Sequence, residues 1–185
     1  HLETAEALAA GAESSGLPLI LQISENCVAF HGGPDPLVLA CLAIARASSA
    51  RLSVHLDHVE SEELVDAGIR LGVSSLMFDA SRLPYEENVA RTAEVSRRAH
   101  AAGLFVEGEL GEVGGKDGAH APGVRTDPAE AEAFVTATGI DALAVAVGTS
   151  HAMTTRDARL DLDLIARLAA RSGVPLVLHG SSGAD

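Results

Sequence analysis

The feature that most constrains the fold of this chain is a regular alternation of helix-forming segments with short, continuously apolar runs. Apolar runs of this kind are typical of strands buried on both faces, and strands that alternate with helices indicate a parallel sheet. Six helix-to-strand units follow one another at intervals of roughly 22 to 38 residues, as in α/β folds. We therefore predict helices over residues 2–15, 35–49, 61–70, 85–102, 127–139 and 161–172, and strands over 17–23, 52–57, 74–79, 104–109, 142–147 and 175–178.

Capping signals support these helices independently of the hydrophobic pattern. Asp127 and Pro128 place a side-chain acceptor at the N-cap and a proline at the first helical position. Gly16 and Gly173 follow the last residues of two other predicted helices, where glycine can end a helix in the left-handed conformation. Residues close to each helix end therefore predict where these helices begin and end.

Polar residues appear at the C-terminal ends of all six predicted strands: Ser24, His58, Asp79, Glu109, His151 and His179. An open doubly wound sheet needs such residues only at its switch point, whereas a barrel uses the ends of all its strands. We therefore predict an α/β fold of the (β/α)8 TIM barrel type. Because a complete barrel typically needs about 250 residues, we expect the 185-residue chain to be a single incomplete barrel domain, residues 1–185, covering about strands 2 to 7 without the first strand and the last units.

Composition and charge favour a soluble globular domain and argue against nucleic-acid-binding and membrane proteins. Hydrophobic residues make up 47% of the chain and charged residues 21%, as expected for a soluble globular domain. The net charge of −13, with arginines scattered along the chain, argues against nucleic acid as a partner. No apolar run is long enough for a membrane span and no signal peptide is visible, so we expect no membrane partner and a cytoplasmic location. Cys27 and Cys41 lack metal-ligand or redox-motif spacing and are interpreted as ordinary thiols.

Three of the predicted strands also deliver histidines. Strand 52–57 leads into His55-Leu-Asp-His58, strand 142–147 leads into His151, and strand 175–178 leads into His179. The C-terminal ends of parallel strands are where catalytic groups gather, and three histidines form the ligand set of one kind of catalytic zinc site. Strand alternation does not decide between His55 and His58, because it places them on opposite faces and a strand end can turn.

Six segments in fixed order, spread over nearly the whole chain, carry a resemblance to a known family. They are Leu21-Gln-Ile-Ser-Glu-Asn26, His55-Leu-Asp-His58, Leu76-Met-Phe-Asp-Ala-Ser81 with Leu83-Pro-Tyr-Glu-Glu-Asn88, Val106-Glu-Gly-Glu-Leu-Gly111, Val147-Gly-Thr-Ser-His151 and Leu178-His-Gly-Ser-Ser-Gly183. This pattern resembles the class II, zinc-dependent fructose-bisphosphate and tagatose-bisphosphate aldolases.

The resemblance implies a zinc ion with a fourth coordination position open for water or substrate. Its implied ligands are His58, His151 and His179. His55 is then expected to be structural or to support a ligand. Asp79 and Glu109 match carboxylates that can hold a second or displaced metal ion in relatives, and their alternative role is to support the ligand histidines. The resemblance also allows a second divalent or a monovalent cation beside zinc.

The resemblance also implies the proton carriers. Asp57 matches the residue that handles the aldehyde oxygen, and its alternative role is to orient a ligand histidine. The carbon base of relatives is a glutamate on a glycine-rich loop after the fifth strand, which corresponds here to residues 111–123. Alignment of that loop places the base on Asp117, with Glu112 as the other carboxylate. The shorter Asp117 side chain changes the reach of the base, and small misplacements are costly in rate.

Small polar residues match the substrate-binding positions of the family: Ser24, Gly180, Ser181 and Ser182. The last three suit a phosphate group, because small residues let backbone N–H groups approach an anion. Relatives usually follow the second histidine with glycine and soon a lysine, whereas this chain reads His151-Ala-Met-Thr-Thr-Arg156. Thr154, Thr155 or Arg156 could replace the lysine.

The activity implied is the reversible cleavage of a ketose 1,6-bisphosphate, fructose or tagatose, to dihydroxyacetone phosphate and glyceraldehyde 3-phosphate through an enediolate that zinc stabilises. The implied partner is this sugar phosphate, and the implied assembly is a homodimer or homotetramer. A Schiff-base aldolase is disfavoured because the single lysine, Lys116, lies in the glycine-rich loop. The alternatives are a zinc-dependent hydrolase built on the same barrel and a non-catalytic paralogue that binds metal or sugar phosphate.

Overall fold

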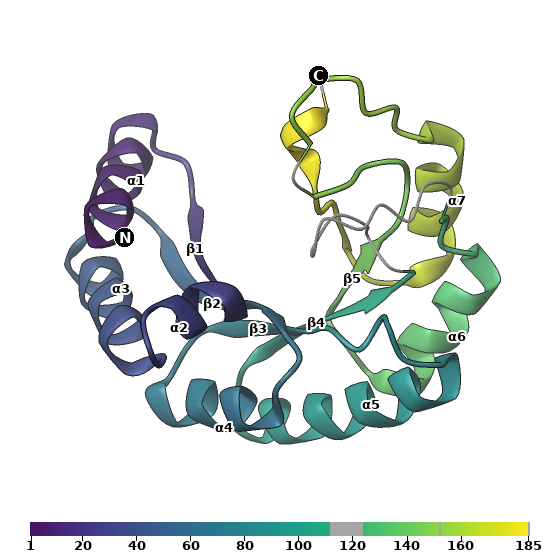
Figure 1. Ribbon diagram of the computed structural model, residues 1–185, viewed down its shortest axis with the longest axis horizontal. Coiled ribbons are helices and arrows are strands. Elements are labelled where there is room, and N and C mark those ends of the chain that lie inside the picture. The colour runs from purple at the N-terminus through teal and green to yellow at the C-terminus, as the bar shows by residue number, and fades with distance from the viewer. Residues whose placement is uncertain (112–123, 152, 185) are drawn as a thin grey trace. The chain divides into compact units, whose positions relative to one another are not determined.

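The computed structural model describes residues 1–111, 124–151 and 153–184 and divides into two compact units. The first unit comprises His1–Phe78 and Arg98–Val106, and the second comprises Asp79–Arg97 and Glu107–Asp185. The chain passes from one unit to the other three times: after Phe78, within a helix after Arg97, and within a strand after Val106. Figure 1 shows the helices and strands of both units in chain order.

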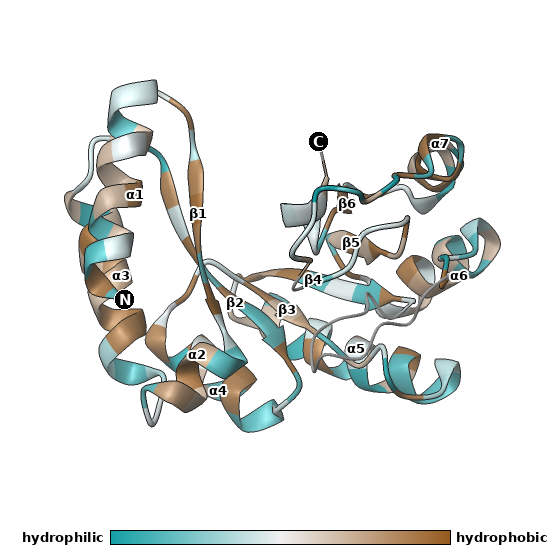
Figure 2. Cartoon of the chain, turned by 45° about the horizontal axis from the view of Figure 1, so that its top comes forward, coloured by the Kyte–Doolittle hydropathy of each residue, from teal (hydrophilic) through white to brown (hydrophobic). Residues whose placement is uncertain are grey.

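The first unit contains three parallel strands with helices between them. Along the chain its elements are α1 (Leu2–Ser15), β1 (Leu19–Ser24), α2 (Glu25–Phe30), α3 (Asp35–Ala47), β2 (Leu52–Val59), α4 (Glu62–Leu71) and β3 (Ser75–Phe78). Strand β2 pairs in parallel with β1 on one side and β3 on the other. Helices α1 and α3 pack side by side against this part of the sheet (Figures 1 and 2).

The second unit continues the same alternation. Its elements are most of α5 (Tyr85–Ala101), most of β4 (Phe105–Leu110), α6 (Pro128–Thr138), β5 (Ala142–Val145), α7 (Leu162–Ser172), β6 (Leu176–Val177) and the 3-10 helix η1 (Ser181–Gly183). Strand β5 pairs in parallel with β4 and with β6. Helices α6 and α7 pack against each other.

All twelve helices and strands expected from the sequence are present, with ends that differ from the predictions by two residues at most, and the strand order follows the sequence. Two short elements were not predicted, α2 and η1. A sheet whose neighbours follow sequence order fits the predicted barrel class better than a doubly wound sheet, whose order reverses at a switch point.

Local sequence explains the helix ends. The Asp127 side chain accepts hydrogen bonds from the N–H groups of Ala129 and Glu130, as predicted for the N-cap of α6. Gly16 and Gly173 end α1 and α7 in the left-handed conformation.

Apolar side chains of strands and helices form the core of each unit. Leu21, Val54 and Leu56 are buried in the first unit, and Leu143 and Phe134 are buried in the second. All residues of β3 and β5 are buried, as expected for strands covered on both faces. Strand β1 differs from this expectation, because Ile20 and Gln22 are exposed although Figure 2 shows hydrophobic colour along much of it. Among the described residues, no helix combines the length and hydrophobicity needed to cross a membrane.

Candidate metal and substrate site

The C-terminal end of β2 departs from regular strand geometry where the sequence analysis placed the first histidines. The pairing with β3 runs through Leu56 opposite Leu76 and resumes with Val59 opposite Phe78, so β2 holds one residue more than β3 in this interval. His58 lies in this bulge with φ 49°, in the left-handed region, and is the one described non-glycine residue with positive φ. A bulge re-aims a side chain. Because of the bulge, the regular alternation of side chains along a strand does not apply at His58, and alternation cannot be used to compare it with His55.

His55 and Asp57 lie next to this bulge. His55 Nδ1 lies 2.8 Å from the hydroxyl of Ser75 on β3, and both residues are buried. This contact gives His55 a role in joining β2 to β3. Asp57 Oδ1 lies 3.9 Å from His55 Nε2, which is too long for a hydrogen bond, and it has no hydrogen-bond partner among the described residues.

Ser24 lies at the end of β1, opposite Asp57 in the parallel register. Its hydroxyl accepts a hydrogen bond from the N–H of Cys27 at 3.2 Å and caps the short helix α2. Two predicted site residues of the first unit are thus neighbours at the same edge of the sheet. The structure also gives Ser24 a structural task that the sequence analysis did not anticipate.

The second unit brings two predicted metal ligands together. A ring nitrogen of His151 and one of His179 lie within 4.8 Å of each other, and the ring centroids are 5.8 Å apart. His179 is buried and His151 is half-buried. Both follow a strand of the sheet, β5 and β6 respectively, although neither belongs to the strand itself.

Glu107 is a site residue that the sequence analysis missed. Its carboxylate Oε1 lies 2.7 Å from His179 Nε2, and each side chain is only 7% exposed. A carboxylate at Nε2 favours the tautomer that carries the proton there and leaves Nδ1 as the lone-pair nitrogen. The signal was present in the sequence, because Glu107 and Glu109 are two residues apart on β4 and such residues share a face.

Asp79 and Glu109, the predicted second carboxylate pair, also lie together within the second unit. A carboxylate oxygen of each lies within 4.8 Å of the other, and both residues are buried. Asp79 accepts hydrogen bonds from the N–H and the hydroxyl of Ser81. The Glu109 carbonyl accepts a hydrogen bond from the side chain of Asn88, which in turn accepts one from Thr92.

The predicted phosphate segment forms the turn into η1. Gly180 has φ 62°, and Ser181 and Ser182 are exposed. A Cβ atom on Gly180 would lie 2.4 Å from the carbonyl carbon of Ser150 and 2.8 Å from the N atom of His151. Only glycine fits this approach of the segment to the backbone of His151.

The proposed carbon base, Asp117, and its alternative, Glu112, lie outside the described residues, as does Ala152. Described residues on both sides of residues 112–123 are hydrogen-bonded to each other. The Thr126 hydroxyl donates to the Leu110 carbonyl at 2.6 Å and accepts from the N–H of Ala146. The assignment of the base to Asp117 stays a prediction.

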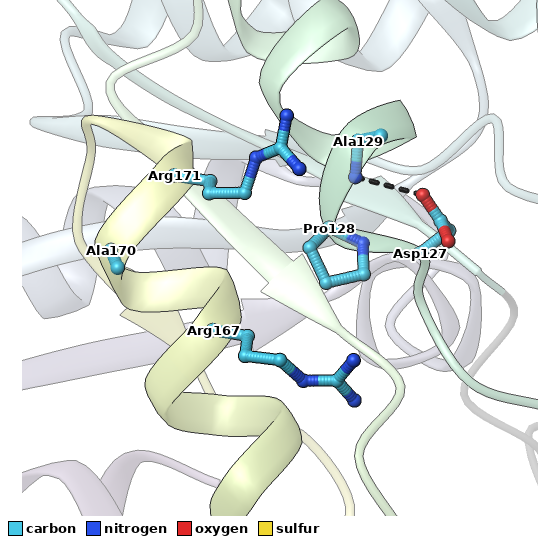
Figure 3. A pocket seen from close by; sticks show the side chains of 6 residues that line it. All are labelled: Asp127, Pro128, Ala129, Arg167, Ala170 and Arg171. Carbon is cyan, nitrogen blue, oxygen red and sulfur yellow. Dashed lines mark hydrogen bonds between the residues drawn. The ribbon is translucent and has the colours of Figure 1, made fainter.

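A pocket of 310 Å³ lies elsewhere in the second unit, between the N-terminus of α6 and α7 (Figure 3). Asp127, Arg167 and Arg171 contribute its polar groups. The two arginines are exposed, and Arg171 forms an ion pair with Glu132 at 2.7 Å. None of its lining residues belongs to the predicted site.

Known proteins resemble the chain over nearly its whole length. The family described as fructose-bisphosphate aldolase class-II matches residues 1–185. A fructose-bisphosphate aldolase of Giardia intestinalis is 41% identical over 170 residues, which cover 89% of this chain and 53% of the relative. A 6-phospho-5-dehydro-2-deoxy-D-gluconate aldolase of Shouchella clausii is 39% identical over 185 residues, which cover 98% of this chain and 63% of the relative.

A solved structure shows the same fold. The YdjI aldolase from Escherichia coli K12 has a TM-score of 0.84 and 32% identity, over 99% of this chain and 64% of that chain. This likeness confirms the predicted α/β fold as part of a TIM barrel. The chain spans less than two-thirds of the length of the relatives named here. Because the family match covers residues 1–185, the chain belongs to the class II fructose-bisphosphate aldolase family.

Proposed function

We propose that the protein containing this chain is a zinc-dependent aldolase that reversibly cleaves a ketose 1,6-bisphosphate to dihydroxyacetone phosphate and glyceraldehyde 3-phosphate. Class II aldolases are metal-dependent lyases, and the family implies a sugar phosphate as substrate. The identity of the metal, its ligands and the sugar are the parts of the proposal that need support from this chain's residues.

The observation that carries the proposal is the pairing of His151 with His179 in the second unit. Their ring nitrogens lie within 4.8 Å, a separation from which two ligands can reach one ion after a small adjustment. Imidazole nitrogens suit zinc. The buried Glu107 supports the same reading, because a carboxylate behind a ligand histidine fixes its tautomer and raises its basicity.

We assign the third ligand to His58. The support is its place at the end of β2 in the motif shared with the family, together with its re-aimed backbone. The family match selects His58 over His55, and we assign to His55 the structural contact of its Nδ1 with Ser75. Asp79 and Glu109 are proposed to hold a second metal ion, and a monovalent cation is the alternative second ion of the protein.

The remaining chemistry is assigned to proton carriers of the chain. A bound zinc ion supplies a Lewis acid that stabilises negative charge on a carbonyl oxygen. Asp57 is proposed to carry the proton for the aldehyde oxygen, which suits a buried carboxylate oxygen with no hydrogen-bond partner among the described residues. Asp117 is proposed as the carbon base.

The substrate contacts are proposed to come from two places. Ser24 is proposed to contact the sugar phosphate at the end of β1, and Gly180, Ser181 and Ser182 are proposed to bind a phosphate group after β6. The relative from Shouchella clausii is named for 6-phospho-5-dehydro-2-deoxy-D-gluconate, so this sugar acid belongs beside fructose and tagatose bisphosphate in any substrate test. A homodimer or homotetramer is the proposed assembly, and the cytoplasm is the proposed location.

The proposal is tested by a coupled assay for triose phosphate with the full-length protein and each of these three substrates. We expect cleavage of at least one bisphosphate, its loss on treatment with a chelator and its recovery when zinc is added. Zinc-restored release of triose phosphate from the sugar acid alone would keep the aldolase but replace its substrate. No release from any substrate by zinc-loaded protein would overturn the aldolase proposal in favour of zinc-dependent hydrolysis or a non-catalytic binding protein.

A further inference from the structure

The two histidines of the second unit stand on loops, so something other than the sheet must fix their separation. Strand β5 ends at Val145, six residues before His151, and β6 ends at Val177, two residues before His179. Backbone beyond a strand end lacks the ladder hydrogen bonds that hold residues in register. Contacts between the two loops must therefore set the separation of the two ligands.

A buried hydroxyl adds a side-chain hydrogen bond between the two loops, beside the close packing of Gly180 against Ser150 and His151. Thr149, two residues before His151, donates a hydrogen bond from its hydroxyl to the main-chain carbonyl of His179 at 2.6 Å. Thr149 and His179 are both buried. The bond therefore connects the loop that carries one histidine directly to the residue that supplies the other.

The Thr149 loop is itself anchored at both ends. The N–H of Asp161 donates to the Val147 carbonyl at 2.9 Å, where the loop leaves and re-enters the fold. A Cβ atom on Gly148 would lie 2.1 Å from the carbonyl oxygen of Arg159, so the backbones are in close contact there. The Thr149 hydroxyl therefore connects His179 to a segment whose backbone is held by these two contacts.

We propose that Thr149 is a positioning residue that sets the separation of the His151 and His179 imidazoles for metal binding. The inference rests on the proposed function, because it assigns the two histidines to one metal ion. The role proposed for Thr149 is therefore indirect. It acts through the backbone of His179, whose side chain is held from the other side by Glu107.

The competing explanation is that the hydroxyl only satisfies a buried carbonyl. Thr138 in α6 provides the matched case, because its buried hydroxyl donates to the Phe134 carbonyl at 2.7 Å and neither residue belongs to the proposed site. Replacing either threonine with valine keeps the shape of the side chain and removes one short hydrogen bond to a carbonyl. Only Thr149→Val should then alter metal binding.

The experiment is a zinc titration of the full-length apoprotein against a chromophoric chelator, for the wild type and for Thr149→Val, Thr149→Ser and Thr138→Val. We expect Thr149→Val to weaken zinc binding by about tenfold or more, in the range seen when partners of metal ligands are removed. Thr149→Ser, which keeps the hydroxyl, should bind zinc nearly as the wild type does. Thr138→Val should leave zinc affinity unchanged even if it lowers the melting temperature.

Equal zinc affinity in Thr149→Val and wild type would overturn the positioning role, as would equal weakening in Thr138→Val. If Thr149→Val does not fold, Thr149→Ala removes the same hydroxyl without placing a methyl group against the carbonyl, and the same criteria apply to it. A wild-type protein that binds no zinc would instead overturn the metal assignment of the proposed function, so the two failures are told apart in one titration.

Discussion

The two units place their candidate ligands in different ways. In the first unit, His58 lies within the sheet, at a bulge of β2, and its position is set by an unusual backbone conformation with φ 49°. In the second unit, His151 and His179 lie beyond the strands and have no such conformation, and they are held by Thr149, Glu107 and the close packing of Gly180.

The contrast shows two ways in which a protein can position a ligand side chain: backbone conformation in one unit and contacts between loops in the other. Backbone strain costs on the order of 1–3 kcal/mol and persists only where the surrounding structure imposes it. Packing and hydrogen bonds between loops instead depend on partners that are far away in the sequence. We expect substitutions in the first unit to act through local conformation and those in the second unit to act through lost contacts.

The largest effect is expected from Gly180→Ala. Its Cβ atom would lie 2.4–2.8 Å from backbone atoms of Ser150 and His151, and φ 62° is unfavourable for alanine. We expect the free energy of unfolding to fall by about 3 kcal/mol or more and zinc affinity to fall with it. Chemical denaturation and zinc titration measure both quantities.

Gly139→Ala is the matched control for this substitution. Gly139 has φ 67°, so alanine meets the same backbone penalty, but no atom lies within 4 Å of its Cβ position. We expect a loss of about 1 kcal/mol in stability and unchanged zinc affinity. If the two variants behaved alike, the backbone conformation alone would explain the Gly180 effect, and packing against the His151 loop would play no part.

Two substitutions of His58 should show whether its positive φ costs stability. His58→Ala and His58→Gly both remove the proposed ligand and should weaken zinc binding by about a hundredfold or more. In an ordinary strand, glycine is less stable than alanine by about 0.5–1 kcal/mol. At φ 49° we expect the reverse, with His58→Gly more stable than His58→Ala by about 1 kcal/mol.

Urea denaturation of the two apoproteins checks this reversal. An alanine variant more stable than the glycine variant would contradict the positive φ of His58. Retention of zinc by both variants would remove His58 from the proposed ligand set, whatever their stabilities.

The smallest effect is expected from Glu107→Gln. The amide keeps the size of the side chain and can still accept a hydrogen bond from His179, but it loses the charge that raises the basicity of the ring. We expect zinc affinity to fall by about tenfold. Zinc affinity in Glu107→Gln equal to that of the wild type, in the same titration, would show that the Glu107 charge does not support His179 as a ligand.

Much of the fold followed from local sequence signals. The Asp127-Pro128 start of α6, its side-chain cap and the glycine stops after the helices were all confirmed, because capping involves residues within a few positions of one another. Helix α2 was missed because it has only six residues, too few to show a periodic apolar face.

The site likewise has features that sequence motifs predicted and features that depend on residues far apart in the sequence. The predictions that His151 and His179 lie together, and that Asp79 and Glu109 lie together, agree with the second unit. Glu107 was overlooked even though it shares a face of β4 with Glu109, because its partner His179 is 72 residues away. The structural tasks of His55 and Ser24 also depend on neighbours that the motif alone does not reveal.

The order of helices and strands, the family and the residue types at the strand ends can be read from the sequence, because hydrophobic periodicity, capping and motif order are properties of short segments. The bulge of β2 at His58, the contact of Glu107 with His179 and the bond from the Thr149 hydroxyl to a carbonyl 30 residues away become visible in the folded chain alone. The physical reason is that these features depend on strand register and loop packing, which arise from contacts between distant segments.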